Sequence, residues 1–116
     1  MTRVLIVDDH PSFRASARAV LEAEGFEVVG EAEDGASALE AARQLKPDVV
    51  LLDVQLPDAN GFDICEFLCG SGPWPEVVLV SSREASDYNG LLQSSHARGF
   101  ISKAELSGDA LRALLA

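Results

Sequence analysis

The sequence is poor in the residues that disulfide-rich, nucleic-acid-binding or membrane proteins depend on. Its two cysteines, Cys65 and Cys69, are too few for a disulfide framework. Lysine and arginine number 9 against 19 acidic residues, and a net charge of −10 repels nucleic acid, so we expect no direct nucleic-acid binding by this chain. No apolar run reaches the length of a membrane span, and no segment has the pattern of a secretory signal. These absences predict a cytoplasmic protein with reduced thiols and no membrane partner.

What the sequence does contain is an alternation of two kinds of segment over its 116 residues. Apolar, β-branched runs predict five strands, at 3–8, 27–32, 49–53, 76–81 and 99–102, and the continuously apolar ones are typical of a parallel sheet covered on both faces. Amphipathic patterns between them predict five helices, of which the fourth, over 84–97, is weakened by polar residues and glycine. This βα order predicts one doubly wound α/β domain over residues 1–116, with no room left for an attached output domain.

Charged and polar residues gather where the predicted strands end, which is the edge at which open α/β sheets bind ligands. Asp8 and Asp9 come at the end of the first strand, and Asp53 ends the third. Ser81 ends the fourth strand, and Lys103 follows the fifth. Three neighbouring carboxylates need more compensation than one lysine supplies, and Mg²⁺ is the natural counter-ion. A carboxylate beside such an ion can accept a phosphoryl group as an aspartyl phosphate.

The same residues, in the same order, resemble the receiver domains of two-component response regulators. The resemblance covers essentially the whole chain and is nearest to the receivers of LuxR/NarL-type regulators, which usually carry a helix-turn-helix domain. It implies the flavodoxin-like fold, a five-stranded parallel sheet in the order 2-1-3-4-5 with five helices. The segments that carry it are 4–10, 48–57, 60–61, 80–82 and 99–103.

The resemblance also implies a role for each matching residue. Asp53 is expected to be the phosphoacceptor, with Lys103 pairing with the phosphoryl group and Ser81 hydrogen-bonding to it. Asp9 and Asp53 are expected to bind Mg²⁺ directly, Asp8 through a water molecule and Gln55 through its backbone carbonyl. The expected metal set is therefore Asp8, Asp9, Asp53 and Gln55, and the expected catalytic set is Asp53, Lys103 and Ser81.

A switch is implied as well. Ser81 and Phe100 resemble the switch pair of the family, in which the hydroxyl moves toward the phosphoryl group and the ring turns inward. Many members have proline after the lysine in a cis peptide, whereas this chain has Ala104, for which we expect a trans bond. Phosphorylation is expected to change a surface formed by the fourth helix, the fifth strand and the fifth helix, which includes Tyr88, Leu91, Arg98 and Arg112.

The expected partners are a histidine kinase or phosphotransfer protein as phosphodonor and an unidentified downstream protein. A homodimer is compatible with the sequence, although no pattern indicates one. As an enzyme, the chain would catalyse only its own phosphorylation and dephosphorylation. Two alternatives remain: a phosphorylation-independent interaction module, and a haloacid-dehalogenase-type phosphatase, which needs an aspartate where this chain has Gln55. We expect His10 to stand at the entrance of the first helix, and both cysteines to be buried structural thiols.

Overall fold

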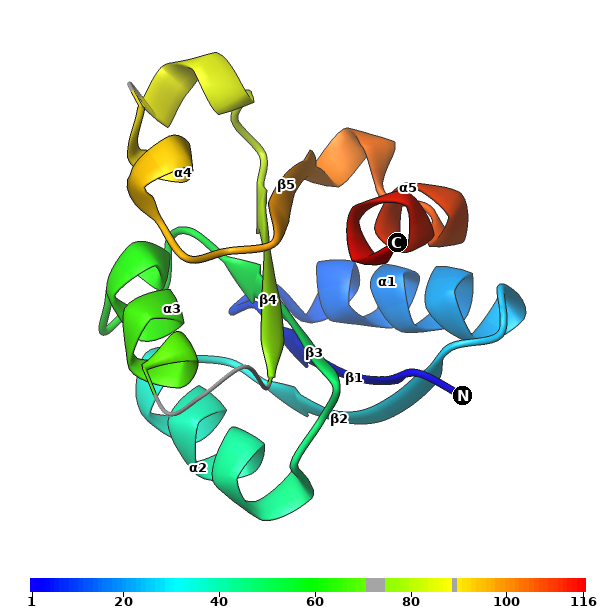
Figure 1. The fold of residues 1–116 in the computed structure, drawn as a ribbon. Helices are drawn as coiled ribbons and strands as arrows, with labels where there is room; N and C mark the ends of the chain where they lie inside the picture. Colours follow the sequence, from blue (N-terminus) through cyan, green and yellow to red (C-terminus); the bar gives the residue numbers. More distant parts are fainter. Residues whose placement is uncertain (71–74, 89) are drawn as a thin grey trace.

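A five-stranded parallel sheet forms the centre of the molecule (Figure 1). The computed structural model describes residues 1–70, 75–88 and 90–116. Its strand order is β2-β1-β3-β4-β5, and every pair of neighbours is parallel, which confirms the doubly wound topology expected from the sequence. The strands are β1 (Arg3–Val7), β2 (Glu27–Ala32), β3 (Val49–Asp53), β4 (Glu76–Ser81) and β5 (Gly99–Ser102).

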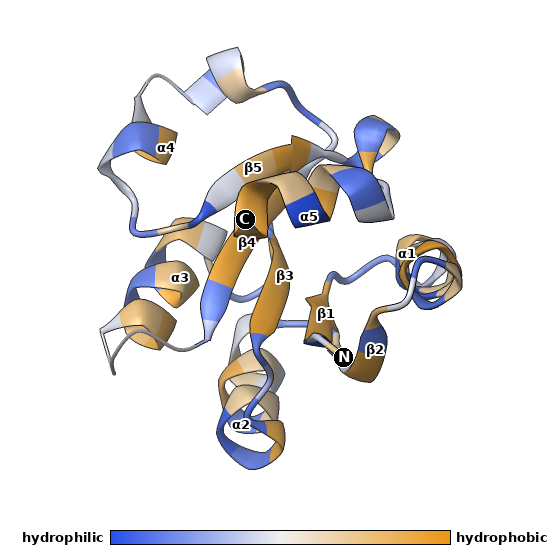
Figure 2. Ribbon diagram, turned by 45° about the vertical axis from the view of Figure 1, so that its right-hand side comes forward, coloured by the Kyte–Doolittle hydropathy of each residue, from blue (hydrophilic) through white to orange (hydrophobic). Residues whose placement is uncertain are grey.

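Helices cover both faces of the sheet, because side chains of each strand point alternately to one face and the other. Leu5 and Val7 of β1 pack with α2 and α3, whereas Val4 and Ile6 pack with α1 and α5. Figure 2 shows the apolar strands between helices whose outer faces are more polar. The helices are α1 (Pro11–Ala23), α2 (Gly35–Leu45), α3 (Gly61–Cys69), α4 (Leu91–Ser94) and α5 (Gly108–Leu115).

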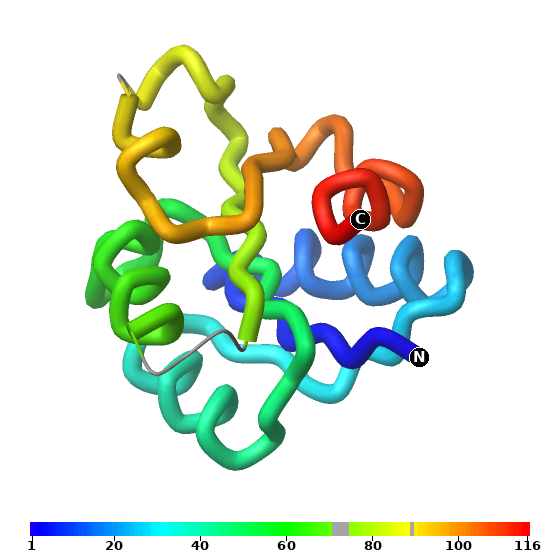
Figure 3. Tube along the Cα trace, in the orientation of Figure 1, coloured from blue at the N-terminus to red at the C-terminus, as the bar shows by residue number. Residues whose placement is uncertain are grey.

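The fourth helix is much shorter than the prediction of 84–97. The chain forms a 3₁₀ turn, η1 (Ala85–Tyr88), and then the single-turn helix α4, which contains no buried residue. Gly90, the N-cap residue just before α4, has a φ of 86°, in the left-handed conformation that glycine adopts easily. A second 3₁₀ turn, η2 (Lys103–Glu105), follows β5 and was not predicted. Figure 3 shows the segments 82–88 and 90–98 lying out from the sheet between β4 and β5.

Local hydrogen bonds place the loops at the carboxyl edge of the sheet. Asn60 caps α3 by accepting a hydrogen bond from the Phe62 N–H, and the Gly61 N–H donates to the Val54 carbonyl at 2.7 Å. A Cβ at Gly61 would collide with the carbonyl oxygen of Asp53, so this glycine lets α3 begin directly against the end of β3.

At the opposite edge Thr2 and Ala116 line one small hollow, which places the two termini near each other (Figure 3). Among the described residues, no helix is long and apolar enough to cross a membrane.

Candidate phosphoacceptor and metal site

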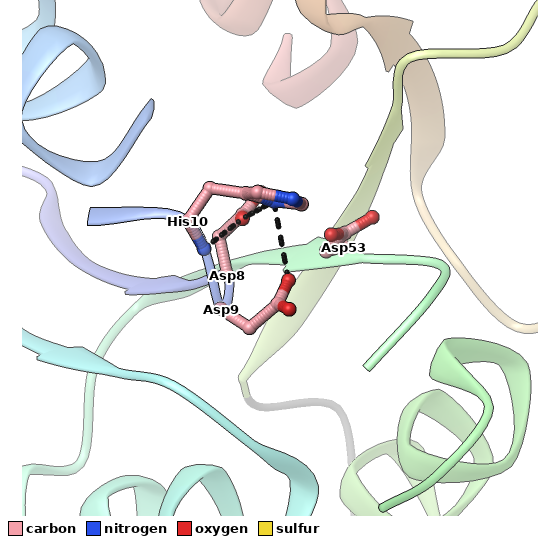
Figure 4. A group of neighbouring side chains, drawn as sticks. All are labelled: Asp8, Asp9, His10 and Asp53. Atoms are coloured by element: carbon pink, nitrogen blue, oxygen red, sulfur yellow. Dashed lines mark hydrogen bonds and ion pairs between the residues drawn. The ribbon is translucent and has the colours of Figure 1, made fainter. Parts of the chain in front are cut away.

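The polar residues that the sequence placed at strand ends meet at one edge of the sheet. Asp8 and Asp9 follow β1, and Asp53 is the last residue of the adjacent strand β3. Ligand atoms of Asp8, Asp9, His10 and Asp53 all lie within 4.8 Å of one another. In Figure 4 the three side chains that follow β1 gather opposite Asp53. Residues 45 positions apart in the sequence thus form one acidic cluster.

Asp8 is the most deeply placed carboxylate of this cluster, with a side chain that is 0% exposed. Its Oδ1 accepts a hydrogen bond from the His10 backbone N–H at 2.8 Å and lies 2.9 Å from His10 Nδ1. Its Oδ2 is the one buried side-chain polar atom in the described part of the chain that has no hydrogen-bond partner. Because it accepts no aligned hydrogen bond, this oxygen depends on nearby positive charge, which Lys103 Nζ supplies at 2.5 Å and which a cation would add to.

Lys103 supplies the positive charge of the site. Its Nζ lies 2.5 Å from Asp8 Oδ2 and 3.3 Å from Asp53 Oδ2, so one ammonium group contacts two buried carboxylates. The contact with Asp8 is an ion pair without the alignment of a hydrogen bond. The ammonium also lies 4.7 Å from the centre of the Phe13 ring on α1. The turn η2, which begins at Lys103, brings this side chain back over the ends of β1 and β3.

Asp53 is 3% exposed, and burial raises the pKa of its carboxyl above the usual value. The neighbouring Asp8 carboxylate adds to this rise. A hydrogen bond from the Gln55 N–H at 3.2 Å and the charge of Lys103 lower the pKa, but they do not offset the two opposing effects. The site therefore holds more negative charge than its own residues compensate.

This donor set fits a hard divalent cation. Its three aspartates offer carboxylate oxygens, the ligand type that Mg²⁺ prefers, and among them is Asp8 Oδ2, which is ion-paired with Lys103 but accepts no aligned hydrogen bond. Asp9 is the most exposed of the three aspartates and is open to solvent from which an ion would enter. Gln55 contacts Asp53 through its backbone N–H; binding of metal by its carbonyl remains a prediction.

His10 has a larger place in the site than the sequence indicated. It is the N-cap residue of α1, as expected, but its side chain does not cap the helix. Instead, Nδ1 lies 2.9 Å from Asp8 Oδ1 and 3.2 Å from Asp9 Oδ1. Its position directly after the two aspartates was the sequence signal that could have predicted this contact.

Ser81 has a partner that the sequence did not reveal. Its hydroxyl is hydrogen-bonded to the hydroxyl of Tyr88 and accepts a hydrogen bond from the Arg83 N–H at 3.0 Å. We expected Tyr88 on an output surface, but it is only 9% exposed. Its ring lies edge-to-face between Phe62 and Phe100. No local pattern could show this contact, because it depends on how the chain turns back after β4.

Comparison with known proteins points to a single family. A family model described as response regulator receiver domain matches residues 4–116. Response regulator GacA of Pseudomonas aeruginosa is 39% identical over 104 residues, covering 89% of this chain and 49% of GacA. DNA-binding response regulator MtrA of Mycolicibacterium smegmatis is 44% identical over 87 residues, covering 73% of this chain and 37% of MtrA. The chain thus spans about half the length, or less, of these curated relatives.

Solved structures agree with the sequence comparison. The signal receiver domain of NarL from Mycobacterium tuberculosis superposes with a TM-score of 0.82 at 37% identity, covering 98% of this chain and 93% of that one. The BeF3-activated receiver domain of RstA from Klebsiella pneumoniae gives a TM-score of 0.86 at 29% identity, with 98% and 96% covered. The fold is therefore shared over nearly the entire length of these receiver domains.

Proposed function

The chain belongs to the response-regulator receiver domains, and from that membership we propose that residues 1–116 form one phosphorylation switch whose phosphoacceptor is Asp53. The observation that supports this most directly is the sharing of one ammonium by two buried carboxylates, Lys103 with Asp8 and Asp53. If these residues formed only a structural ion-pair network, the number of positive charges would match the number of carboxylates. An excess of buried negative charge at a ligand-binding edge instead favours a cation and a transferable anionic group.

Mg²⁺ would be the resident cation, and Asp8, Asp9, Asp53 and the Gln55 carbonyl would hold it. When bound, it supplies positive charge that offsets charge on the phosphoryl oxygens during transfer. In the transfer itself, a carboxylate oxygen of Asp53 forms a bond to phosphorus while the P–N bond of a phosphohistidine breaks. The imidazole of the histidine kinase or phosphotransfer protein leaves.

Lys103 orients the acceptor and then pairs with the product. Its ammonium already lies 3.3 Å from Asp53 Oδ2, so a short movement away from Asp8 brings it to an oxygen of the new phosphoryl group. The Ser81 hydroxyl donates a hydrogen bond to another of these oxygens once it leaves its present partners. The same residues hold the acyl phosphate while water hydrolyses it. The chain therefore catalyses only its own phosphorylation and dephosphorylation.

The output of the switch lies in another protein or in another part of a longer chain. MtrA is named as a DNA-binding response regulator, and this chain matches 37% of its length. By analogy, we propose control of transcription through a separate DNA-binding segment, because the charge of −10 on this chain repels nucleic acid. We also propose a cytoplasmic location, which suits the two free cysteines.

The test is phosphorylation of the purified chain by acetyl phosphate and Mg²⁺, followed by intact-mass measurement. We expect the mass of one added phosphoryl group, lost on treatment with hydroxylamine and absent from Asp53→Asn. The matched control is Asp109→Asn, which removes an exposed carboxylate far along the chain in α5 and should leave the adduct unchanged. An unmodified wild-type chain would refute the proposal and favour a phosphorylation-independent interaction module. Turnover of small phosphomonoesters would favour a phosphatase instead.

A further inference from the structure

We propose that Tyr88 is a positioning residue for the switch: its hydroxyl holds the Ser81 hydroxyl in the unphosphorylated receiver, and its ring fills the space that Phe100 must enter. This inference rests on the proposed phosphorylation of Asp53. It changes the expected mechanism in one respect, because the aromatic residue that contacts Ser81 comes from η1 and not from β5.

Hydrogen bonds fix the side chain of Ser81 in the unphosphorylated domain. Ser81 is 2% exposed, and its hydroxyl bonds to Tyr88 and to the Arg83 N–H, two groups of the segment that follows β4. Hydroxyl groups have directional bonds, so these two partners hold the Ser81 side chain toward η1. To reach a phosphoryl group on Asp53, Ser81 must turn and give up the bond to Tyr88.

Aromatic contacts fix the ring of Tyr88 between two other rings. The centre of the Tyr88 ring lies 5.6 Å from that of Phe62 on α3 and 5.9 Å from that of Phe100 on β5, with interplanar angles of 69° and 61°. Both arrangements are the favoured edge-to-face type. The Tyr88 ring thus lies between α3 and β5 and contacts an aromatic ring of each. Phe100 is only half-buried, and the tyrosine ring packed against it occupies the space into which we propose that it turns.

The two short elements η1 and α4, next to β4, bury few side chains. The turn η1 has four residues, and only Tyr88 among them is buried. The helix α4 also has four residues, and none of them is buried. Tyr88 is therefore the one buried side chain of η1 and α4; Leu92 of α4 packs against the same core but is only partly buried, and such sparsely anchored segments open readily.

Phosphorylation would release this anchor by competition. A hydrogen bond from Ser81 to an anionic phosphoryl oxygen is stronger than one between two neutral hydroxyl groups. Once Ser81 turns, Tyr88 loses its partner, its ring leaves the space beside Phe62, and Phe100 turns in. The tyrosine then becomes exposed on the segment 82–98, where a partner protein can contact it.

The chain contains one tyrosine, so this movement can be followed at a single site. Protein made with 3-fluorotyrosine gives one ¹⁹F resonance. We expect it to shift on addition of BeF₃⁻ and Mg²⁺, or on phosphorylation by acetyl phosphate, and to become more sensitive to a soluble paramagnetic agent. An unchanged resonance in protein whose Asp53 adduct is confirmed by mass would overturn the inference and leave the proposed function intact. Absence of any adduct would overturn the proposed function itself.

Variants separate positioning from plain packing. Tyr88→Phe keeps the ring and removes the hydroxyl; loss of one neutral hydrogen bond that favours the resting state should speed acetyl phosphate labelling about fivefold. In the background of Ser81→Ala, Tyr88→Phe should have no further effect, since the partner is already gone. Phe67→Leu, at an exposed aromatic residue of α3, is the matched control and should label at the wild-type rate.

A thermal melt checks that each variant is folded. Equal rates for Tyr88→Phe and the wild-type chain would refute the positioning role, as would an equal acceleration with and without Ser81. A tyrosine that served packing alone would change the melting temperature without these effects on rate and on the ¹⁹F resonance.

Discussion

The ammonium of Lys103 lies 2.5 Å from Oδ2 of Asp8, closer than to Asp53, the proposed phosphoacceptor. In the resting receiver, therefore, the lysine that the resemblance assigns to phosphate pairs mainly with another carboxylate. The two residues are far apart in the sequence but lie at the ends of β1 and β5, on the same edge of the sheet. This pair makes the stability of the domain and the chemistry of the site depend on the same charge.

Replacing Lys103 should destabilise the domain most when Mg²⁺ is absent. Lys103→Met keeps much of the packing against Phe13 but leaves two buried carboxylates without their ammonium. We expect a loss of about 2–4 kcal/mol in the free energy of unfolding, measured by urea denaturation with EDTA. Saturating Mg²⁺ should restore part of it. The matched control is Lys46→Met at the exposed end of α2, for which a loss as large as that of Lys103→Met would contradict the argument.

Removing the charge of Asp53 should have the opposite effect on stability. The pKa of Asp53 is raised by burial and by Asp8, so its ionised form costs free energy in the folded protein at neutral pH. We expect Asp53→Asn to stabilise the chain by about 1 kcal/mol in EDTA while abolishing the acyl phosphate. Mg²⁺ should then stabilise the wild-type chain more than the variant. A variant that unfolds at lower urea in EDTA would contradict this prediction.

Stability should also depend on pH through Glu31 on β2. Its carboxylate lies 2.8 Å from Arg18 Nε and 3.0 Å from Arg14 Nε, and hydrogen bonding to Arg18 is the main reason that the pKa of Glu31 is lowered. A lowered pKa in the folded state stabilises the protein above the pKa of the unfolded chain, about 4.3, and this stabilisation is lost as pH falls through the folded value. Glu31→Gln should therefore cost about 0.5–1 kcal/mol at pH 7 and progressively less in acid.

Urea denaturation of both chains between neutral pH and acid measures this difference. Glu27→Gln, at an exposed position of the same strand, is the control and should show little change. A cost of Glu31→Gln that stays constant as the carboxyl becomes protonated would show that the ion pairs with Arg14 and Arg18 are not its source.

The two thiols of α3 should differ in reactivity. Cys65 is fully buried, and burial raises its pKa to about 12, whereas Cys69 is partly exposed and burial raises its pKa less. Because the thiolate is the reactive form, iodoacetamide should add once to the native chain, at Cys69, and twice in urea. Mass spectrometry of Cys69→Ala and Cys65→Ala distinguishes the two sites. Rapid native labelling of Cys69→Ala would contradict the burial of Cys65.

Gly61 should tolerate no side chain. A Cβ there would collide with the Asp53 carbonyl oxygen and the Val54 Cα, both of them backbone atoms that have little freedom to move. We expect Gly61→Ala to cost about 1–3 kcal/mol and to slow phosphorylation, because β3 must shift at the phosphoacceptor. Gly70→Ala, at the other end of α3 with φ of −66°, should cost less. Equal unfolding free energies for the two variants would refute the close approach at Gly61.

The sequence alone predicted most of the sheet and the meeting of its polar strand-end residues at one edge. Strands such as β3 and β4 carry continuous apolar runs, and burial of both faces leaves them little alternative to a central position. Asp8, Asp53 and Lys103 could be placed together because parallel strands end at one edge. The fourth helix was predicted wrongly: the described residues of 84–97 form η1 and a single turn of α4, since their polar side chains bury too little to stabilise a longer helix.

The tertiary structure alone decided which of these groups contact one another. The pairing of Lys103 with Asp8, the turn of His10 toward the carboxylates and the insertion of Tyr88 beside Ser81 depend on side-chain orientation and on packing between distant elements. Apolar periodicity reports burial on a face, which is a local property of the chain. Hydrogen bonds and ion pairs require distances that only the assembled sheet and its loops determine.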